Sequence, residues 1–223
     1  MILEASKVNL YYEKYGSGQP LILLHGNGED HTIFEKAIPL LEKYFTVYAI
    51  DSRGHGKSSG VSELHYEELA GDIYEFICQL QLEKPVVYGF SDGGIVALLL
   101  EINHPNLLSQ MVISGVNTQP DGIKAGWLFL FKLAYFFTKS SQMKLMITEP
   151  DISMEMLKKI QIPVAVTAGS KDVIKLSHIC EISETISKST LEIFKGETHD
   201  SYVIGSEKIA EYIIEECVEK RTV

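Results

Sequence analysis

The chain alternates short apolar runs with longer amphipathic segments, and this alternation constrains its fold more than any other feature of its 223 residues. The apolar runs have the length of strands and occupy residues 20–26, 45–52, 85–91, 108–115, 162–169 and 190–196. The segments between them have the length of helices and occupy residues 32–43, 62–82, 93–103, 175–187 and 201–219. Strands and helices in turn predict an α/β fold, in which helices cover both faces of a mostly parallel sheet.

Two segments depart from this alternation. Residues 1–15 alternate apolar and polar side chains with a period of two and predict an antiparallel hairpin at the edge of the sheet. Residues 117–150 interrupt the series between two strands and contain the aromatic stretch GWLFLFKLAYFF at helical spacing. We therefore expect residues 1–223 to form a single domain with a small helical lid inserted at about 117–150.

The composition excludes several classes of partner. A formal net charge of −10, without a cluster of Lys and Arg, argues against nucleic acid as a partner. The three cysteines, Cys78, Cys180 and Cys217, lie far apart in helical segments, as buried thiols of a reduced compartment do. Neither a signal peptide nor a membrane-spanning run occurs, so we expect a cytoplasmic protein with no membrane span. The oligomeric state is left open.

Four predicted strands lead into loops that carry reactive or hydrogen-bonding groups. Residues 25–28, with the sequence His-Gly-Asn-Gly, follow one strand, and the other three lead to Ser91, Asp172 and His199. Functional loops of a parallel sheet gather beyond the carboxyl ends of its strands. We therefore expect these groups to lie together at one edge of the sheet.

Residues 89–93, Gly-Phe-Ser-Asp-Gly, form a G-x-S-x-G pattern between a strand and a helix. In this position the pattern predicts a nucleophile elbow centred on Ser91. The turn is so tight that the serine takes a strained backbone conformation and its neighbours two positions away must be glycine. The helix that follows directs its N–H groups and its positive end toward charge that develops beside the serine.

A serine hydroxyl needs a base to remove its proton, and His199 follows a strand end where it can serve as that base. Asp172 is predicted to orient and stabilise the imidazole. The three residues occur in the chain order Ser, Asp, His, each after a strand. This combination predicts a Ser91, Asp172, His199 triad.

With these motifs the chain resembles the α/β-hydrolase superfamily along essentially its whole length. The resemblance is carried by YEKYGSGQPLILLHG, YAIDSRGHGKS, YGFSDGG, IPVAVTAGSKD and GETH. It implies an oxyanion hole built from the backbone N–H groups of Asn27 and Asp92, and a structural turn at residues 51–58. The insertion is short for the superfamily. The resemblance implies a serine hydrolase that cleaves small carboxylic esters or thioesters through an acyl-enzyme and needs no cofactor.

The same scaffold supports other functions. Hydrolysis of carbon–carbon bonds and opening of lactones use the same triad, and a ligand-binding relative without catalysis is a further alternative. A small-molecule ester is the partner that we predict.

Asp92 has two interpretations. Its side chain caps the helix that follows, as aspartate at a helix start often does, or it binds a cationic group of the substrate. The second interpretation comes from the elbow, which resembles that of valacyclovir hydrolase, an α-amino-acid ester hydrolase whose matching aspartate binds the substrate's amino group. Aromatic residues of the insertion are predicted to form an apolar roof over the substrate, and they are Trp127, Phe129, Phe131 and Tyr135.

Other motifs are incomplete. GHGKSS lacks the first glycine of a phosphate-binding loop, because that position holds Asp51. No dinucleotide-binding fingerprint is complete, and the scattered histidines predict no metal site. His25 is expected to shape its loop, and His31 is expected at the surface or at its boundary.

Overall fold

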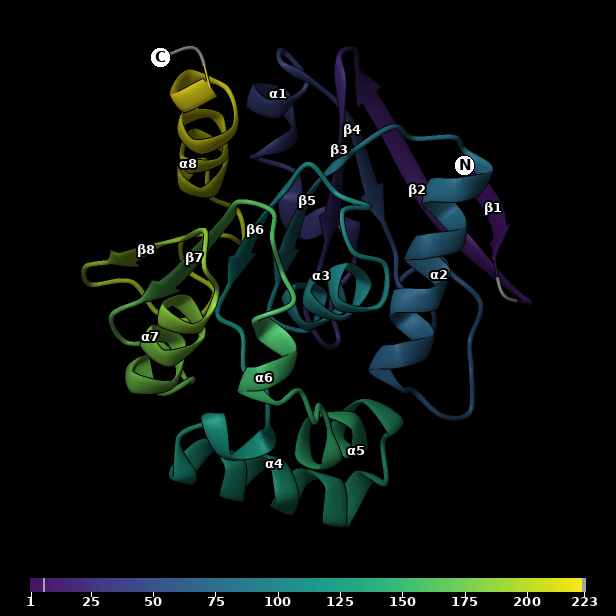
Figure 1. Cartoon of the computed structure of the whole chain (residues 1–223). Coiled ribbons are helices and arrows are strands. Elements are labelled where there is room, and N and C mark those ends of the chain that lie inside the picture. The colour runs from purple at the N-terminus through teal and green to yellow at the C-terminus, as the bar shows by residue number, and fades with distance from the viewer. Residues whose placement is uncertain (6, 222–223) are drawn as a thin grey trace.

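The computed structural model describes residues 1–5 and 7–221, and it places eight strands in one sheet (Figure 1). The order across the sheet is β1-β2-β4-β3-β5-β6-β7-β8. The strands are β1 (Ile2–Ala5), β2 (Val8–Gly16), β3 (Gln19–Leu24), β4 (Phe45–Ile50), β5 (Val86–Phe90), β6 (Gln110–Ser114), β7 (Val164–Gly169) and β8 (Ser189–Phe194). From β4 to β8 all neighbours are parallel, whereas β1 pairs with β2, and β2 with β4, in antiparallel fashion. The predicted mostly parallel sheet and its antiparallel edge hairpin are confirmed.

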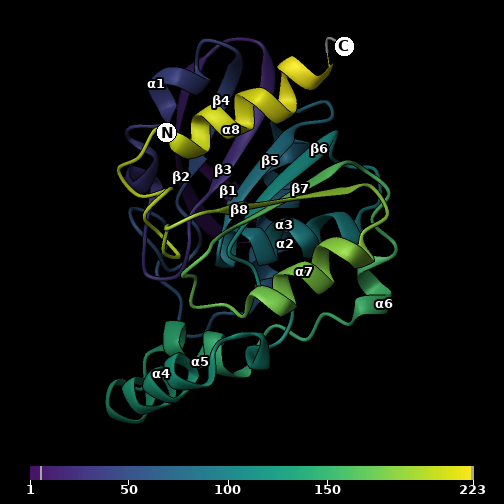
Figure 2. The ribbon, with the colours of Figure 1, turned by 90° about the vertical axis from the view of Figure 1, so that its left-hand side faces the viewer.

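Helices cover both faces of the sheet (Figures 1 and 2). One face carries α1 (Ile38–Leu41) and α8 (Lys208–Cys217), and the other carries α2 (Tyr66–Gln79), α3 (Asp92–Asn103), α6 (Met154–Leu157) and α7 (Leu176–Thr185). Successive side chains of a strand point to opposite faces. Accordingly, Leu21 and Leu23 of β3 join the core under α1 and α8, and Ile22 and Leu24 join the core under α2 and α3. Strands buried on both faces explain the continuous apolar runs of the sequence.

The helix α3 lies at the centre of the second core. Eleven of its twelve residues are buried, from Asp92 to Ile102, as its nearly all-apolar sequence predicts. Gly94 is needed at the start of α3, because a Cβ there would lie 2.2 Å from Val116 Cγ1 and 3.0 Å from the carbonyl oxygen of Gly89 in β5. This close packing places the start of α3 against the end of β5.

Two predicted helices differ from the observed ones. Residues 32–43 form a 3₁₀ turn at His31–Phe34 and then the separate short helix α1. Pro39 lies in the first turn of α1, where its missing N–H is tolerated, so it starts a new helix and cannot lie inside a longer one. The predicted helix 201–219 begins only at Lys208, because turns precede it and Gly205 has a φ of 61°.

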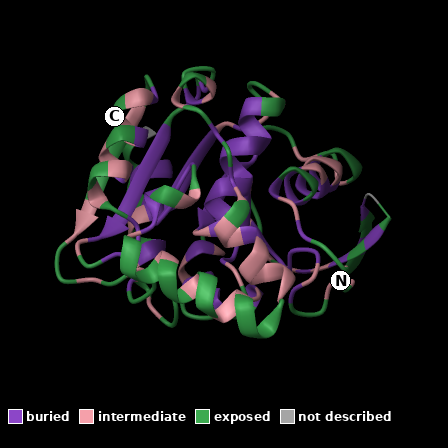
Figure 3. Cartoon of the chain, turned by 90° about the horizontal axis from the view of Figure 1, so that it is seen from below, coloured by how far each residue is buried: buried purple, intermediate pink, exposed green. Residues whose placement is uncertain are grey.

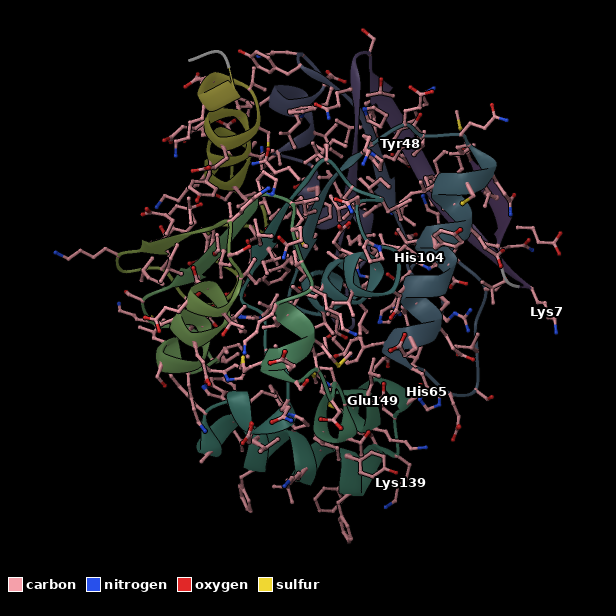
Figure 4. The ribbon with its side chains drawn as sticks, viewed as in Figure 1. Lys7, Tyr48, His65, His104, Lys139 and Glu149 are labelled. Atoms are coloured by element: carbon pink, nitrogen blue, oxygen red, sulfur yellow. The ribbon has the colours of Figure 1, made fainter. Side chains whose placement is uncertain are left out.

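The predicted insertion contains a 3₁₀ turn (Pro120–Gly122), α4 (Ala125–Thr138) and α5 (Ser141–Thr148). Both helices lie below the body of the molecule in Figures 1 and 2. The far end of the insertion is tied to the start of α2: Glu149 accepts a hydrogen bond of 2.6 Å from His65 Nδ1 and one of 3.1 Å from the backbone N–H of Tyr66. His65 and Glu149 are neighbours in Figure 4.

The cysteines all lie in helices, as predicted, but only Cys217 is buried; Cys78 is exposed and Cys180 is half-buried. Cys78 occupies a position near the end of α2 that faces solvent, so the expected burial of all three thiols is wrong. None of the helices in the described part of the chain combines the length and the apolar character needed to cross a bilayer.

Candidate active site

Ser91 lies in the tight turn between β5 and α3. Its φ of 52° and ψ of −115° are unfavourable for a residue with a side chain, and the turn is held by a hydrogen bond of 2.8 Å from its N–H to the carbonyl of Ser114. The neighbouring glycines are required. A Cβ on Gly89 would lie 2.3 Å from the carbonyl oxygen of Gly93, and a Cβ on Gly93 would lie 2.3 Å from that of Leu24. The elbow geometry expected from the sequence is therefore present.

The structure brings Ser91, Asp172 and His199 together. Ser91 Oγ lies 3.1 Å from His199 Nε2, and His199 Nδ1 lies 2.7 Å from Asp172 Oδ1. Asp172 is buried in the loop after β7, and its Oδ1 also accepts a hydrogen bond of 2.9 Å from the N–H of Ile174. The carboxylate thus holds the imidazole with Nε2 toward the serine, which is the arrangement that lets a histidine remove a hydroxyl proton.

Two contacts that the sequence analysis missed position the imidazole. The ring of Phe90 lies 5.0 Å from that of His199, centroid to centroid. Gly115, which follows β6, leaves the space that the ring occupies, because a Cβ there would lie 2.6 Å from His199 Cε1. The φ of +62° at Gly115 also favours glycine. In the sequence, the glycine at the end of the predicted strand 108–115 was the feature that could have indicated a close approach at this position.

Asp92, the first residue of α3, is buried and faces the same pocket as Ser91. Its Oδ1 accepts a hydrogen bond of 2.7 Å from the hydroxyl of Tyr66, and its Oδ2 accepts one of 2.8 Å from Asn27 Nδ2. Burial raises the pKa of Asp92, and these two donors oppose that rise. The helix-capping interpretation is wrong, because both carboxylate oxygens bond to side chains outside α3. Position in sequence gave no sign that Tyr66 would be a partner.

Asn27 lies in the loop after β3. Besides Asp92, its side-chain amide reaches the carbonyl of Gln142 at 3.3 Å, so it links the elbow to α5. The backbone of this loop is fixed by His25, whose Nδ1 lies 2.8 Å from the carbonyl of Gly26 and whose Nε2 accepts a hydrogen bond of 3.0 Å from Ser52 N–H. Burial lowers the pKa of His25 to about 4, so its ring is neutral and shapes the loop.

Glu29 is a pocket residue that the sequence analysis did not single out. Its Oε2 accepts a hydrogen bond of 2.9 Å from the N–H of Gly26, which orders the loop that carries Asn27. Burial raises the pKa of Glu29 to about 7, although this hydrogen bond and the nearby His199 oppose the rise. The only sequence signal was its place four residues after His25.

A pocket of about 270 Å³ is lined by Ser91 together with polar and apolar side chains. The polar lining includes Asn27, Glu29, Tyr66 and Asp92. The apolar lining comes from the insertion and the loop after β7, with Ile123, Trp127, Phe131, Met143, Met146, Val173 and Ile174. A concave, mostly apolar site with a few polar groups is typical of small-molecule binding.

The aromatic residues expected to roof the substrate divide into two pairs. Trp127 and Phe131 line the pocket. Tyr135 lies outside it, with Lys139 Nζ 5.2 Å from its ring centroid, and Phe129 is 65% exposed. Positions four apart on a helix share a face, but the pocket ends one turn before Tyr135. The arrangement does not support substrate contact by Tyr135 or Phe129.

One group of side chains in the described chain, Asp30, His31 and Asp51, has its possible metal-binding atoms within 4.8 Å of one another. Hydrogen bonds already engage these atoms: Asp51 Oδ1 lies 2.6 Å from His31 Nδ1, and Asp30 Oδ1 accepts one of 2.8 Å from Thr32 N–H. None of the three is among the residues that line the pocket. His31 is buried, whereas the sequence predicted a place at the surface or at its boundary, and its imidazole bonds to the buried Asp51.

Residues 19–142, more than half of the chain, match the family described as the alpha/beta hydrolase fold, and the chain belongs to this family. It is 36% identical over 104 residues to a pimeloyl-[acyl-carrier protein] methyl ester esterase of Vibrio campbellii, a match that covers 47% of this chain and 39% of that protein. It is 32% identical over 120 residues to the sn-1-specific diacylglycerol lipase ABHD11 of Danio rerio, covering 51% and 37%. The matched part thus spans less than half the length of these curated relatives.

Solved structures resemble this chain over nearly its whole length. An esterase from Exiguobacterium antarcticum superimposes with a TM-score of 0.80 at 26% identity, covering 96% of this chain and 98% of that one. A meta-cleavage product hydrolase from Pseudomonas fluorescens superimposes with a TM-score of 0.82 at 20% identity, covering 99% and 98%. At that identity the second comparison shows the shared fold alone.

Proposed function

We propose that this protein is a serine hydrolase that cleaves small carboxylic esters through an acyl-enzyme. The observation that carries the proposal is the chain of two hydrogen bonds from Ser91 to His199 and from His199 to Asp172. Ser91 and His199 both line the pocket, which gives a substrate access to the hydroxyl. The esterases among the similar proteins support the same reaction class.

In the first half of the reaction, Ser91 Oγ attacks the acyl carbon while His199 Nε2 takes the hydroxyl proton. Asp172 stabilises the imidazolium that forms. The carbonyl electrons move to the oxygen, and the backbone N–H groups of Asn27 and Asp92 are our candidates to hold this oxyanion. When the tetrahedral intermediate collapses, the bond to the alcohol oxygen breaks and His199 returns the proton to it.

In the second half, water takes the place of the alcohol. His199 removes a proton from the water, the hydroxide adds to the acyl carbon, and the bond to Ser91 Oγ breaks as the serine regains its proton. The products are the free acid and the original enzyme. Both halves use only side chains and backbone of this chain.

A carboxylate next to the nucleophile opposes the formation of an oxyanion, and the surroundings of Asp92 reduce this effect. Tyr66 and Asn27 each donate a hydrogen bond to it, and it lies at the positive end of α3. These interactions partly offset the negative charge of Asp92. The backbone N–H of Asp92 can therefore donate to an oxyanion although the carboxylate of the same residue is nearby.

α-Amino-acid esters are a second candidate class of substrate, favoured by the position of Asp92. Its carboxylate lines the pocket, where the lining side chains include neither Lys nor Arg. An ammonium group on the acyl part would find there a carboxylate to pair with. Thioesters are compatible with the same mechanism, but no contact favours them over oxygen esters.

The experiment that tests the proposal measures kcat/KM on p-nitrophenyl esters of increasing acyl length, together with neutral and α-amino esters of one alcohol. We expect turnover of the short esters and a loss of up to about 10⁶-fold in Ser91→Ala. Ser187→Ala removes an exposed serine and serves as the matched control. Turnover retained by Ser91→Ala refutes the assignment of the nucleophile.

The same panel separates the candidate substrates. A preference for α-amino esters that disappears in Asp92→Asn makes Asp92 a substrate-binding residue. The same ranking in wild type and variant makes the enzyme a plain carboxylesterase. If no ester is turned over, the carbon–carbon and lactone substrates and the non-catalytic alternative become the better explanations.

A further inference from the structure

The helix α4 is unusual because it is strongly apolar and yet exposed. None of its fourteen residues is buried. Its most exposed members include Phe136, at 65%, and Phe137, at 74%, and Leu130 is 51% exposed. Seen from below in Figure 3, the side of the molecule that carries α4 shows exposed and intermediate residues where the sheet behind it is buried. An exposed apolar surface of this kind is typical of a site that binds another protein or a membrane.

The spacing of residues shows that α4 has two apolar faces. Trp127 and Phe131 are four residues apart and both line the pocket, so they define the inner face. The outer face is formed by residues three and four apart on the opposite side, which are Phe129, Leu130, Leu133, Phe136 and Phe137. The inner face is accounted for by the pocket, whereas the side chains of the outer face are still 43–74% exposed in the described part of the chain.

Positive charge accompanies this outer face. Residues 122–148 contain four lysines and no acidic residue, in a chain whose net charge is −10. Lys124 donates to the carbonyl of Asp172 and Lys144 pairs with Glu63, so these two are engaged with the body of the protein. Lys132 and Lys139 are exposed on or beside α4.

Lys139 lies close to the outer face itself. Its Nζ is 5.1 Å from the ring centroid of Phe136, and the rings of Phe136 and Phe137 lie 5.3 Å apart in an edge-to-face arrangement. Figure 4 shows Lys139 at the lower border of the molecule, at the end of α4. Lys132 lies on the same side of the helix as Lys139, seven residues earlier. The outer face is thus an apolar stripe with two cations along one margin.

We propose that the outer face of α4 binds the surface of an anionic lipid bilayer. Helices that lie in a membrane interface combine exposed Phe, Leu and Trp side chains with lysines that meet the headgroups. Phe129, Phe136 and Phe137 enter the boundary of the acyl chains, and Lys132 and Lys139 pair with anionic headgroups.

Charge favours this occupant over a second copy of the chain. A two-fold contact between two outer faces would bring the same two lysines of each copy toward each other, and neither copy offers an acidic residue in 122–148 to neutralise them. Anionic headgroups supply the missing negative charge. At the lipid surface the apolar stripe and the cations are both satisfied, which a contact between two outer faces does not achieve.

The position of α4 also connects this surface to the pocket. Trp127 and Phe131 line the pocket from the inner face of the same helix. An amphiphilic ester that leaves the bilayer therefore has only α4 between the membrane surface and the pocket that contains Ser91. This step rests on the proposed function, whereas binding to lipid does not. Vesicle binding and ester hydrolysis therefore test the two proposals separately.

The experiment is co-sedimentation of the full chain with vesicles of phosphatidylcholine mixed with phosphatidylserine, and with vesicles of phosphatidylcholine alone. We expect binding to the mixed vesicles, and a loss of about tenfold or more in the Phe136→Gln/Phe137→Gln variant. The Lys132→Gln/Lys139→Gln variant should lose the preference for phosphatidylserine. Ser91→Ala should bind as the wild type does.

Matched controls come from elsewhere on the surface. Ile2→Gln removes an exposed apolar side chain from β1, and Lys7→Gln/Lys188→Gln removes two exposed lysines. Both should bind vesicles as the wild type does, and circular dichroism of every variant should match that of the wild type.

Three results would overturn the proposal. The first is that the wild type fails to bind the mixed vesicles. The second is that the Phe136→Gln/Phe137→Gln variant binds them as well as Ile2→Gln does. The third is that the wild type forms a dimer that this double variant abolishes while vesicle binding persists. The last result would make the outer face a contact between copies.

Discussion

At the scale of single residues, Asp92 shows how one carboxylate acquires a role from its neighbours. An aspartate at the start of a helix often caps the helix backbone. Here Tyr66, from α2, and Asn27, from the loop after β3, donate to it. Tyr66 is 26 positions and Asn27 is 65 positions from Asp92 along the chain, so only folding brings the three side chains together. The resulting network ties two separate loops to the elbow.

Glu29 gives a prediction about pH. Burial raises its pKa from an ordinary 4.5 to about 7, so the folded protein binds a proton there that the unfolded chain has lost between these values. Stability therefore falls as the pH rises through this window, and the contribution is fully present below 4.5. Glu29→Gln, which keeps an acceptor for Gly26 N–H, should stabilise the fold by about 2 kcal/mol near pH ~8, allowing for partial exposure.

Urea unfolding of Glu29→Gln and wild type at both ends of this range measures the effect. The ionisable neighbours of Glu29 are His199, Asp92 and Asp200, which remain in both proteins. Glu35→Gln, on an exposed carboxylate, is the matched control and should change the stability little at either pH. An equal stability difference at low and high pH would contradict the prediction.

At the scale of elements, a buried ion pair connects the turn at residues 51–58 to α2. Arg53 donates two hydrogen bonds of 2.7 Å to Asp72 of α2, and a third of 2.7 Å to Glu68. Burial raises the pKa of Asp72, while Arg53 opposes that rise. The predicted structural turn is thereby anchored to α2.

Arg53→Met should destabilise the protein by about 3–5 kcal/mol, because it leaves Asp72 buried without its partner. Arg53→Met/Asp72→Leu removes both charges and should recover most of this loss. Urea denaturation followed by circular dichroism measures both. If the double variant is no more stable than the single one, the loss comes from packing and not from the unpaired carboxylate.

The sequence predicted the elements and the site residues that depend on local pattern. Ser91, Asp172 and His199 could be selected because each follows a strand, and parallel strands end at one edge of a sheet. Tyr66 and Glu29 could not, because their place in the site depends on how α2 and the loop after β3 pack. The predicted helix 32–43 is interrupted before Pro39. The proline was visible in the sequence, but the prediction gave more weight to the helical spacing of the apolar residues.

At the scale of the whole molecule, the sheet separates two cores. Phe76 of α2 is buried on one face and Ile213 of α8 on the other, and neither side chain is exposed. Alternate residues of the same strands contribute to both cores, so neither core can lose its structure while the sheet between them stays intact. We therefore expect the chain to unfold as a single unit.

Phe76→Ala and Ile213→Ala should therefore each lower the free energy of unfolding of one shared transition, by about 3–5 and 2–5 kcal/mol respectively. Each variant should shift the midpoint in urea and leave the slope unchanged, because the same surface is exposed on unfolding. Ile2→Ala, at an exposed position of β1, should shift it by less than about 0.5 kcal/mol. A curve that splits into two steps in one variant would mean that the two faces unfold independently, because the strands between them would then not transmit the loss from one core to the other.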